Sequence, residues 1–301
     1  MRIRSGDVVG VVAPSGVVEE SRLRAGSGVL EAMGFRVLLG DAVLSRRAYL
    51  AGADAERAAD VQRMLDDPTV AAVFCARGGF GAQRVVPFLD LAPVRHRPKP
   101  VVGYSDATAL LAALAGVGVV GMHGPMVATD MPRGLSARSL RHLERLLTDP
   151  TYRWELEAPT CIRPGHARGR LAGGCLSVLV TTLGTPWAPD FDGAVVFLED
   201  VHEWPYRLDR LLTHLLQSGC LEHAAGVVFG TLEACRPLDG VSPLDVVRDL
   251  FADAPYPVAL GVPAGHANAE TDVDNLALPL GVDVELDAGA GRLVAREAAV
   301  V

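Results

Sequence analysis

Runs of apolar, β-branched residues alternate with amphipathic or alanine-rich segments through the first half of the chain. The apolar runs predict strands, over residues 7–13, 35–39, 70–75, 101–103 and 118–122. The segments between them predict helices, over residues 19–33, 54–65, 81–89 and 107–114. Strands that are apolar on both faces and are separated by helices are typical of a parallel sheet covered by helices. We therefore expect an α/β fold whose N-terminal domain is a doubly wound, mostly parallel sheet.

The pattern changes near residue 140. Residues 141–168 are polar and contain prolines, which predicts a linker. The elements expected beyond it are strands over 194–198, 227–229 and 258–260, a helix from Pro205 to about Ser218, and a closing hairpin over 282–286 and 292–295. The sequence thus predicts an N-terminal α/β domain over 1–140, a linker over 141–168 and a smaller C-terminal α/β domain over 169–301.

Composition narrows the class of protein. The chain has 301 residues, 50% of them hydrophobic, and a formal net charge of -8. It has no sustained block of lysine and arginine, so the electrostatic footprint of a nucleic-acid-binding protein is missing. Five cysteines without a Cys-x-x-Cys pair favour a reduced compartment over a disulfide framework. The first residues show no convincing signal-peptide cleavage site, and we predict a cytoplasmic protein.

One segment has the length of a membrane span. Residues 107–129 contain no Asp, Glu, Lys or Arg. Four glycines and a proline crowd the second half of this segment, which therefore favours a helix followed by a buried strand. We expect no association with membranes.

The hexapeptide Gly-Tyr-Ser-Asp-Ala-Thr at 103–108 places Ser105 between an apolar strand and an alanine- and leucine-rich helix. A serine at such a turn can expose its hydroxyl while the first N–H groups of the helix face a developing oxyanion. Serine and aspartate are also preferred helix caps, so the hexapeptide taken alone favours an N-cap. The choice depends on whether the chain supplies a base, an orienting carboxylate and oxyanion donors.

Two further motifs follow predicted strands. The segment Arg-Gly-Gly-Phe-Gly at 77–81 predicts a tight turn whose backbone N–H groups can approach an anion. It is not a dinucleotide-binding fingerprint, because Arg84 occupies the position of the third glycine. Glu199 and Asp200 end a strongly apolar strand, where a carboxylate either orients a histidine or is simply solvated. Arg207, in the helix that follows, binds either an anionic group of a substrate or a neighbouring acid.

Histidine is the side chain most often used as a base near neutral pH. His266 follows a predicted strand in a glycine-containing loop, and His123 follows another strand. No two histidines have the spacing of a zinc site. The acidic run at 270–274 lacks the glycine and the distal glutamate of a calcium loop. We therefore expect no bound metal.

Eight short motifs occur in a characteristic order. They are Gly-Asp-x-Val-Gly at 6–10, Arg-Gly-Gly-Phe-Gly at 77–81, Gly-Tyr-Ser-Asp-Ala-Thr at 103–108, His-Gly-Pro-Met at 123–126, Gly-Gly at 173–174, Leu-Glu-Asp at 198–200, Pro-Tyr-Arg-Leu-Asp-Arg at 205–210 and Gly-His at 265–266. With them the chain resembles the LD-carboxypeptidase family of serine peptidases, which also contains the microcin C self-immunity peptidases. The resemblance is collinear from about residue 6 to residue 281.

The resemblance implies a Ser-His-Glu triad shared by the two domains. Ser105 would be the nucleophile, Glu199 the orienting carboxylate and His266 the general base. The backbone N–H of Asp106 and one from the turn at Gly78 and Gly79 would form the oxyanion hole. The residues expected to contact a substrate are Arg77, His123, Tyr206 and Arg207.

A cytoplasmic homodimer without a metal or an organic cofactor is also implied. The family-type substrate is a muropeptide tetrapeptide of peptidoglycan recycling, which loses its terminal D-alanine. Two alternatives remain. One is hydrolysis of a microcin-like peptide-nucleotide, with Trp187 or Trp204 stacked on the base. The other is a non-catalytic nucleotide-binding or sensory protein that uses the loop at Gly78 and Gly79.

Overall fold

The computed structural model describes residues 2–267 and 274–301, and the chain divides into two compact units. The first unit comprises Met1–Pro150, Leu276–Pro279 and Ala299–Val301, and the second comprises Thr151–Asn275 and Leu280–Ala298. Each unit is built on its own sheet with helices packed against it. The predicted mixed α/β fold class is confirmed.

The first unit holds a six-stranded sheet in the order β12-β5-β4-β3-β1-β2. Its strands are β1 (Val8–Val12), β2 (Arg36–Leu39), β3 (Val70–Cys75), β4 (Val101–Gly103), β5 (Gly121–His123) and β12 (Leu278–Leu280). Strands β1 to β5 pair in parallel, as the apolar runs predict. The carboxyl ends of β1, β3 and β4 therefore meet at one edge of the sheet.

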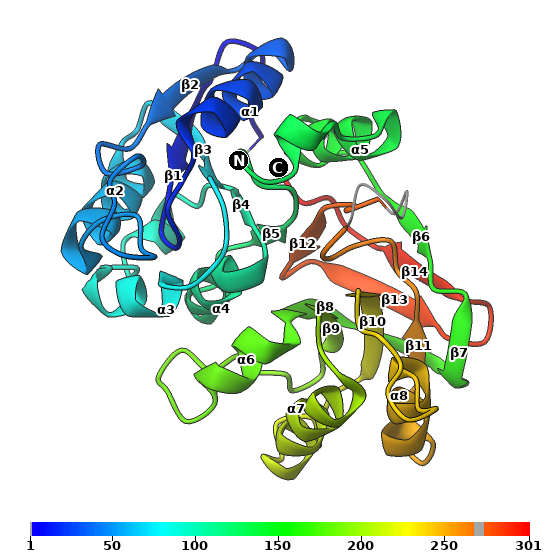
Figure 1. Ribbon diagram of the computed structural model, residues 1–301. Coiled ribbons are helices and arrows are strands. Elements are labelled where there is room, and N and C mark those ends of the chain that lie inside the picture. Colours follow the sequence, from blue (N-terminus) through cyan, green and yellow to red (C-terminus); the bar gives the residue numbers. More distant parts are fainter. Residues whose placement is uncertain (1, 268–273) are drawn as a thin grey trace. The chain divides into compact units, whose positions relative to one another are not determined.

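The helices of this unit are α1 (Glu20–Ala32), α2 (Asp54–Asp66), α3 (Ala82–Val85), α4 (Thr108–Gly116) and α5 (Ala137–Thr148). Short 3-10 turns lie at η1 (Val86–Phe88), η2 (Val94–His96), η3 (Ser105–Ala107) and η4 (Met131–Arg133). Figure 1 shows α1 on one face of the sheet and α2, α3 and α4 on the other. This is the doubly wound arrangement, and it buries the strands on both faces.

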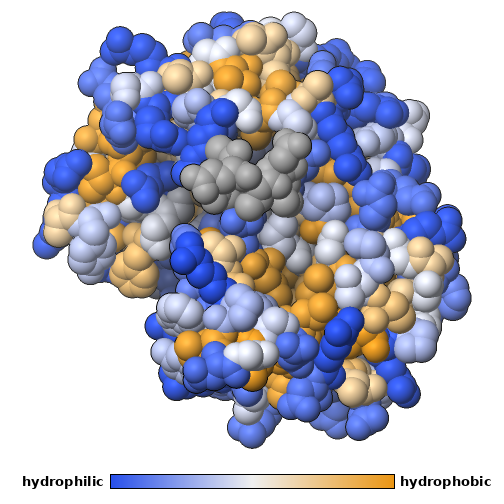
Figure 2. Space-filling model, turned by 45° about the vertical axis from the view of Figure 1, so that its right-hand side comes forward, coloured by the Kyte–Doolittle hydropathy of each residue, from blue (hydrophilic) through white to orange (hydrophobic). Residues whose placement is uncertain are grey.

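The uncharged segment at 107–129 is part of this core. Residues 108–114 of α4 are all buried, and β5 follows after a short turn. Within the described residues no helix has the length and apolarity needed to cross a membrane. Figure 2 shows hydrophilic residues spread over the drawn face, with hydrophobic residues grouped between them.

The second unit holds an eight-stranded sheet in the order β6-β14-β13-β8-β9-β10-β11-β7. The strands are β6 (Glu155–Glu157), β7 (Thr160–Arg163), β8 (His166–Cys175), β9 (Val195–Val201), β10 (Gly226–Glu233), β11 (Val258–Leu260), β13 (Asp283–Asp287) and β14 (Arg292–Ala295). Strands β8 to β11 run parallel, whereas β7, β13, β14 and β6 pair antiparallel. The predicted closing hairpin is confirmed as β13 and β14.

Three helices pack against the parallel part of this sheet. They are α6 (Leu176–Thr182), α7 (Pro205–Gln217) and α8 (Pro243–Phe251). Their apolar faces join the strands in one core, in which Leu198, Leu208, Leu212, Phe229 and Phe251 have no exposed surface. This core holds the ends of β9 and β10 in place, and those ends carry candidate site residues.

The region predicted as a linker is folded, which corrects that prediction. Residues 141–168 contain most of α5, all of β6 and β7 and the start of β8. Leu143, Leu146 and Leu147 bury one stripe of α5, while the other side of the helix is polar. The edge strands β6 and β7 are short and half exposed, so their composition resembles that of a loop. The boundary between the units falls at Pro150 and Thr151 instead.

Candidate active site

Ser105 lies at the turn between β4 and α4. It begins η3 with a φ of +59°, a left-handed conformation that is uncommon for a residue other than glycine. Neither η3 nor α4 has a side-chain cap, so the N-cap interpretation of this serine is wrong. Backbone strain at a strand-to-helix turn is characteristic of exposed nucleophiles.

The glycine turn after β3 approaches this serine closely. A Cβ atom built on Gly78 would lie 2.9 Å from both Cβ and Oγ of Ser105 and 3.5 Å from the backbone nitrogen of Asp106. Gly79 has a φ of +114°, which favours glycine. The backbone of the predicted oxyanion turn therefore lies against Ser105 and Asp106, where only a residue without a side chain fits.

The side chain of Asp106 is buried and hydrogen-bonds the loop after β1 and the start of α3. Its exposure is 4%, and its Oδ2 accepts hydrogen bonds from Ser15 Oγ at 2.6 Å and from the backbone nitrogen of Ala82 at 2.7 Å. Burial raises the pKa of this carboxyl group, and the two hydrogen bonds oppose that rise.

Glu199 and His266 meet in the second unit. Glu199, on β9, is fully buried, and the side chain of His266 is 16% exposed. Glu199 Oε2 lies 2.7 Å from Nδ1 of His266 and accepts a second hydrogen bond from the backbone nitrogen of His266 at 2.9 Å. Because an ionised carboxylate only accepts, this contact assigns the proton to Nδ1 and leaves Nε2 as the basic nitrogen.

The loop that carries His266 is held by two further side chains. Thr231 Oγ1, on β10, donates to the carbonyl oxygen of His266 at 2.7 Å. Asn275 Oδ1 accepts from the backbone nitrogen of Gly265 at 3.1 Å. Gly265 has a φ of +118°, and a Cβ atom there would lie 2.6 Å from Thr231 Oγ1 and 2.8 Å from Glu199 Oε2. The loop can therefore approach the carboxylate only with glycine at this position.

The other carboxylates near the end of β9 have different partners. Asp200 accepts from the backbone nitrogen of Ser177 at 2.8 Å, at the start of α6. Burial raises the pKa of Asp200 to about 6, and the nearby charge of Glu199 adds to the rise. Glu203 forms an ion pair with Arg207. Among the described residues, Glu199 is the one of these three carboxylates that hydrogen-bonds His266.

The four residues expected to contact a substrate differ in environment. The guanidinium of Arg77 donates to the carbonyl oxygens of Val17 and Gly78. Tyr206 is 53% exposed, while Arg207 is engaged by Glu203. His123 has no exposed surface and packs its ring 5.6 Å from that of Tyr104. His123 ends the buried strand β5, and its contact with a substrate stays a prediction.

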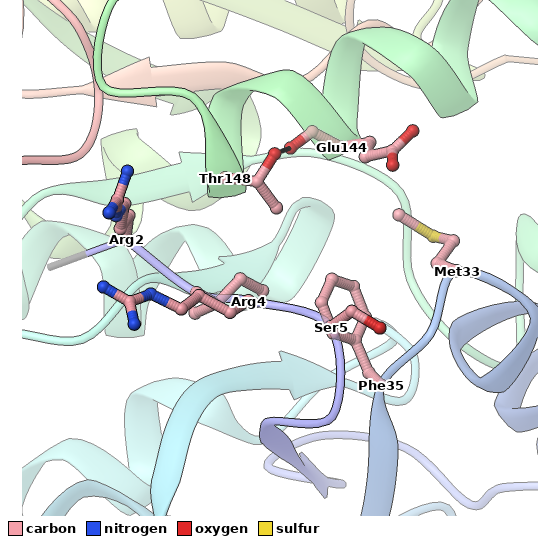
Figure 3. Close-up of a pocket in the computed structure, with 8 residues that line it drawn as sticks. Arg2, Arg4, Ser5, Met33, Phe35, Glu144 and Thr148 are labelled. Atoms are coloured by element: carbon pink, nitrogen blue, oxygen red, sulfur yellow. Dashed lines mark hydrogen bonds between the residues drawn. The ribbon is translucent and has the colours of Figure 1, made fainter.

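Surface cavities lined by described residues other than Ser105 occur in both units. A cavity of about 400 Å³ in the first unit is lined by Arg2, Ile3, Arg4, Ser5, Met33, Phe35, Glu144 and Thr148. Figure 3 shows the guanidinium groups of Arg2 and Arg4 on one side and Met33 on the other. A second, of about 580 Å³, lies over β6, β8, β13 and β14 in the second unit. The first is next to the amino ends of β1 and β2, whereas Ser105 follows the carboxyl end of β4.

No metal centre is evident in the part of the chain that the structure describes, where His, Cys, Asp and Glu form no group of three suited to a metal ion. The acidic run at 270–274 lies outside the described residues, apart from Asp274.

Sequence reasoning did not assign roles to Ser15, Thr231 or Asn275. The sequence does give a signal for Ser15 and Thr231. Each is a polar residue near the carboxyl end of an apolar strand, where ligands gather in α/β sheets. Asn275 gives no such signal, because its contact with Gly265 exists only in the folded protein.

Serine-type hydrolases typically have a serine with a strained backbone that caps no helix and lies beside a glycine turn. They also have a histidine oriented by a buried carboxylate. The protein-family model of the LD-carboxypeptidase N-terminal domain matches residues 9–124 of this chain. The family model of the LD-carboxypeptidase C-terminal domain matches residues 168–286. The chain therefore belongs to the LD-carboxypeptidase family. It is a serine-type carboxypeptidase.

Known proteins resemble this chain over nearly its whole length. A relative from Bacillus subtilis, named "probable murein peptide carboxypeptidase", is 37% identical over 293 residues, which cover 95% of this chain and 90% of the relative. The crystal structure of a muramoyltetrapeptide carboxypeptidase from Oxalobacter formigenes has a TM-score of 0.84 and 32% identity, covering 96% of this chain and 97% of that one.

A second branch shares the fold. The structure of a microcin C7 self-immunity protein has a TM-score of 0.88 and 23% identity, covering 100% of this chain and 98% of that one. At that level of identity the likeness is one of fold.

Proposed function

We propose that this protein is an LD-carboxypeptidase that removes the terminal D-alanine from muropeptide tetrapeptides. In this proposal Ser105 is the nucleophile and His266 the general base. Glu199 is the carboxylate that orients the imidazole and stabilises its protonated form. The observation that carries it is the 2.7 Å contact between Glu199 Oε2 and His266 Nδ1. A buried carboxylate in that position holds the histidine in the tautomer whose Nε2 can accept a proton.

The chemistry follows that of an acyl-enzyme. Ser105 Oγ attacks the carbonyl carbon of the terminal amide while its proton passes to His266 Nε2. The oxyanion accepts hydrogen bonds from the backbone N–H of Asp106 and from the turn at Gly78 and Gly79. His266 then protonates the amine of D-alanine as the C–N bond breaks. Water attacks the ester by the reverse path and regenerates the serine. No step requires a metal or an organic cofactor.

The substrate class rests on the relatives. The names of the Bacillus and Oxalobacter proteins specify murein peptide and muramoyltetrapeptide as substrates. We extend the same class to this chain, together with a role in peptidoglycan recycling, a cytoplasmic location and a homodimeric state. Arg77, Tyr206 and Arg207 remain candidates for contact with the peptide, and Arg207 would have to leave or share Glu203.

Product analysis tests the proposal. The purified protein is incubated with a free tetrapeptide ending in D-alanine, with the epimer ending in L-alanine, and with an aminoacyl-sulfamoyl adenosine, and products are identified by mass spectrometry. We expect D-alanine from the first substrate. A site shaped around one stereocentre leaves polar groups unpaired with the wrong epimer, at a cost that can reach about 10⁴-fold.

The panel also separates the alternatives. Preferential cleavage of the adenosine compound would assign the protein to the microcin-immunity branch, and equal cleavage of both epimers would contradict LD-specificity. Failure of a fluorophosphonate probe to label Ser105 would favour a non-catalytic protein, because only an activated serine reacts.

A further inference from the structure

One carboxylate oxygen joins two loops at the carboxyl edge of the first sheet. Oδ2 of Asp106 accepts from Ser15, in the loop after β1, and from Ala82, the first residue of α3. All three residues are buried, with exposures of 4% for Asp106 and 0% for Ser15 and Ala82. The turn that follows β4 is thereby bonded to the loops that follow β1 and β3.

A buried arginine bonds the same two loops from another direction. Arg57, on α2, is 1% exposed, and its Nη1 donates to the carbonyl oxygens of Pro14 and Gly81. Pro14 and Gly81 directly precede Ser15 and Ala82 in the sequence. Arg57 therefore holds the segments 14–15 and 81–82 through a backbone carbonyl of each. Asp106 holds the same segments through the side-chain hydroxyl of Ser15 and the backbone N–H of Ala82.

This arrangement bears on the oxyanion hole. One of its proposed donors is the backbone N–H of Asp106 itself, and the other lies on the turn at Gly78 and Gly79, which leads into Ala82. The two donors lie on separate loops, so the distance between them depends on the hydrogen bonds that connect these loops. Oxyanion donors act only when they are held 2.7–3.1 Å from the developing charge, and removal of one such donor typically lowers kcat by about 10²- to 10³-fold.

We propose that the Asp106 carboxylate is a positioning residue that sets the spacing of the two oxyanion donors by binding Ser15 and Ala82. This role rests on the proposed function of Ser105. The contribution is to the rate of acylation and not to ground-state binding of the peptide, because the side chain is buried behind the turn.

The surroundings of the Asp106 side chain favour its replacement by asparagine, which is neutral and has the same shape. Burial raises the pKa of Asp106, so the ionised side chain is costly here, and both hydrogen bonds reach a single oxygen. The amide oxygen of asparagine can accept the same two bonds. Alanine cannot accept either bond, and it releases both loops.

The test compares Asp106→Ala with Asp106→Asn. Kinetics with the D-alanine tetrapeptide, the rate of fluorophosphonate labelling and thermal unfolding are measured for each. We expect Asp106→Ala to lower kcat and the labelling rate by at least about 100-fold, with KM changed by less than about threefold, and Asp106→Asn to recover kcat to within about tenfold of wild type.

Asp60 supplies a matched control in the same unit. It is also 4% exposed and accepts hydrogen bonds from the backbone nitrogens of Asp41 and Ala42, near the end of β2. Asp60→Ala should lower the melting temperature while leaving the kcat of the folded protein near that of wild type. If Asp106→Ala does not fold, Ser15→Ala removes one of the two bonds with a smaller change and should still lower kcat by about tenfold.

Three results would overturn the role. They are a kcat within threefold of wild type for the folded alanine variant, equal losses of kcat in the Asp106 and Asp60 variants, and a loss expressed only in KM. Failure of the wild type to react with the fluorophosphonate probe and to cleave any compound of the panel would instead overturn the function proposed for Ser105, and the role of Asp106 with it.

Discussion

A single oxygen of Glu199 accepts hydrogen bonds from both the backbone nitrogen and Nδ1 of His266, at 2.9 and 2.7 Å. The hydrogen bond from the backbone nitrogen fixes the position of the loop, and the hydrogen bond from Nδ1 fixes the orientation of the imidazole ring. The same carboxylate thus determines the position and the tautomer of the proposed base.

We expect Glu199→Gln to lower kcat by about 10³- to 10⁴-fold, as loss of the correct tautomer does in a Ser-His-Asp triad. Glu203→Gln is the matched control and should change kcat by less than tenfold, because Glu203 pairs with Arg207. Steady-state kinetics on the D-alanine tetrapeptide measure both. A larger loss for the Glu203 variant than for the Glu199 variant would show that the assignment of the carboxylate is wrong.

Ser105→Ala and His266→Ala should each abolish turnover and leave the fold intact, because residues that act as one unit lose nearly all activity singly. Ser136→Ala is a useful comparison, since Ser136 does cap a helix, α5, by accepting from the backbone nitrogen of Ser139. That variant should lose about 1 kcal/mol of stability and keep its activity. More than a tenth of wild-type kcat/KM in a folded Ser105 or His266 variant, a loss under about 1.4 kcal/mol, contradicts the assignment.

Thr231→Val should lower kcat by about tenfold with little change in KM, because the carbonyl of His266 loses its hydrogen-bond donor and the base loses part of its restraint. Thr231→Ser retains the hydroxyl and should restore kcat. Thr182→Val is the control, because Thr182, which is fully buried, likewise donates to a carbonyl, that of Leu179. If the serine variant is as slow as the valine variant, the hydrogen bond is not what positions His266.

Gly78→Ala should reduce kcat and slow fluorophosphonate labelling by more than about tenfold. The new methyl group would stand 2.9 Å from Cβ and Oγ of Ser105, so the turn or the serine must shift. Gly28→Ala, on α1, meets no atom within 4 Å and should instead stabilise the protein by about 0.5–1 kcal/mol without changing kcat. Normal labelling of the Gly78 variant would argue against an oxyanion turn at this position.

Asp200→Asn should change how stability depends on pH. Burial raises the pKa of Asp200 to about 6 in the folded state, from 3.8, so the folded protein binds a proton more tightly than the unfolded chain. The stability contributed by this protonated group is complete below about pH 4 and is lost as the pH rises through 6. The wild type should therefore lose up to about 3 kcal/mol relative to the asparagine variant between pH 4 and pH 7. Urea unfolding at several pH values measures the difference, and parallel curves for the two proteins would refute it.

Much of the fold was predictable from the sequence. The alternation of apolar runs and amphipathic segments located β1 to β5 and the helices between them, because burial of a strand on both faces requires apolar residues throughout. It also placed Ser105 at a strand-to-helix turn and Glu199 at the end of an apolar strand. The region at 141–168 was mistaken for a linker, because short edge strands and a half-polar helix have the composition of a loop.

Tertiary structure decided which carboxylate serves His266. Glu199 and Asp200 are adjacent on β9, so their side chains project to opposite faces of the sheet. Glu199 faces the loop that carries His266, and Asp200 faces the first turn of α6. A strand pattern shows that neighbours face apart but does not show what covers each face. Folding also brought together Arg57, Asp106 and the loops at 14–15 and 81–82, which are far apart in sequence, because only the parallel register of β1, β3 and β4 places their carboxyl ends side by side.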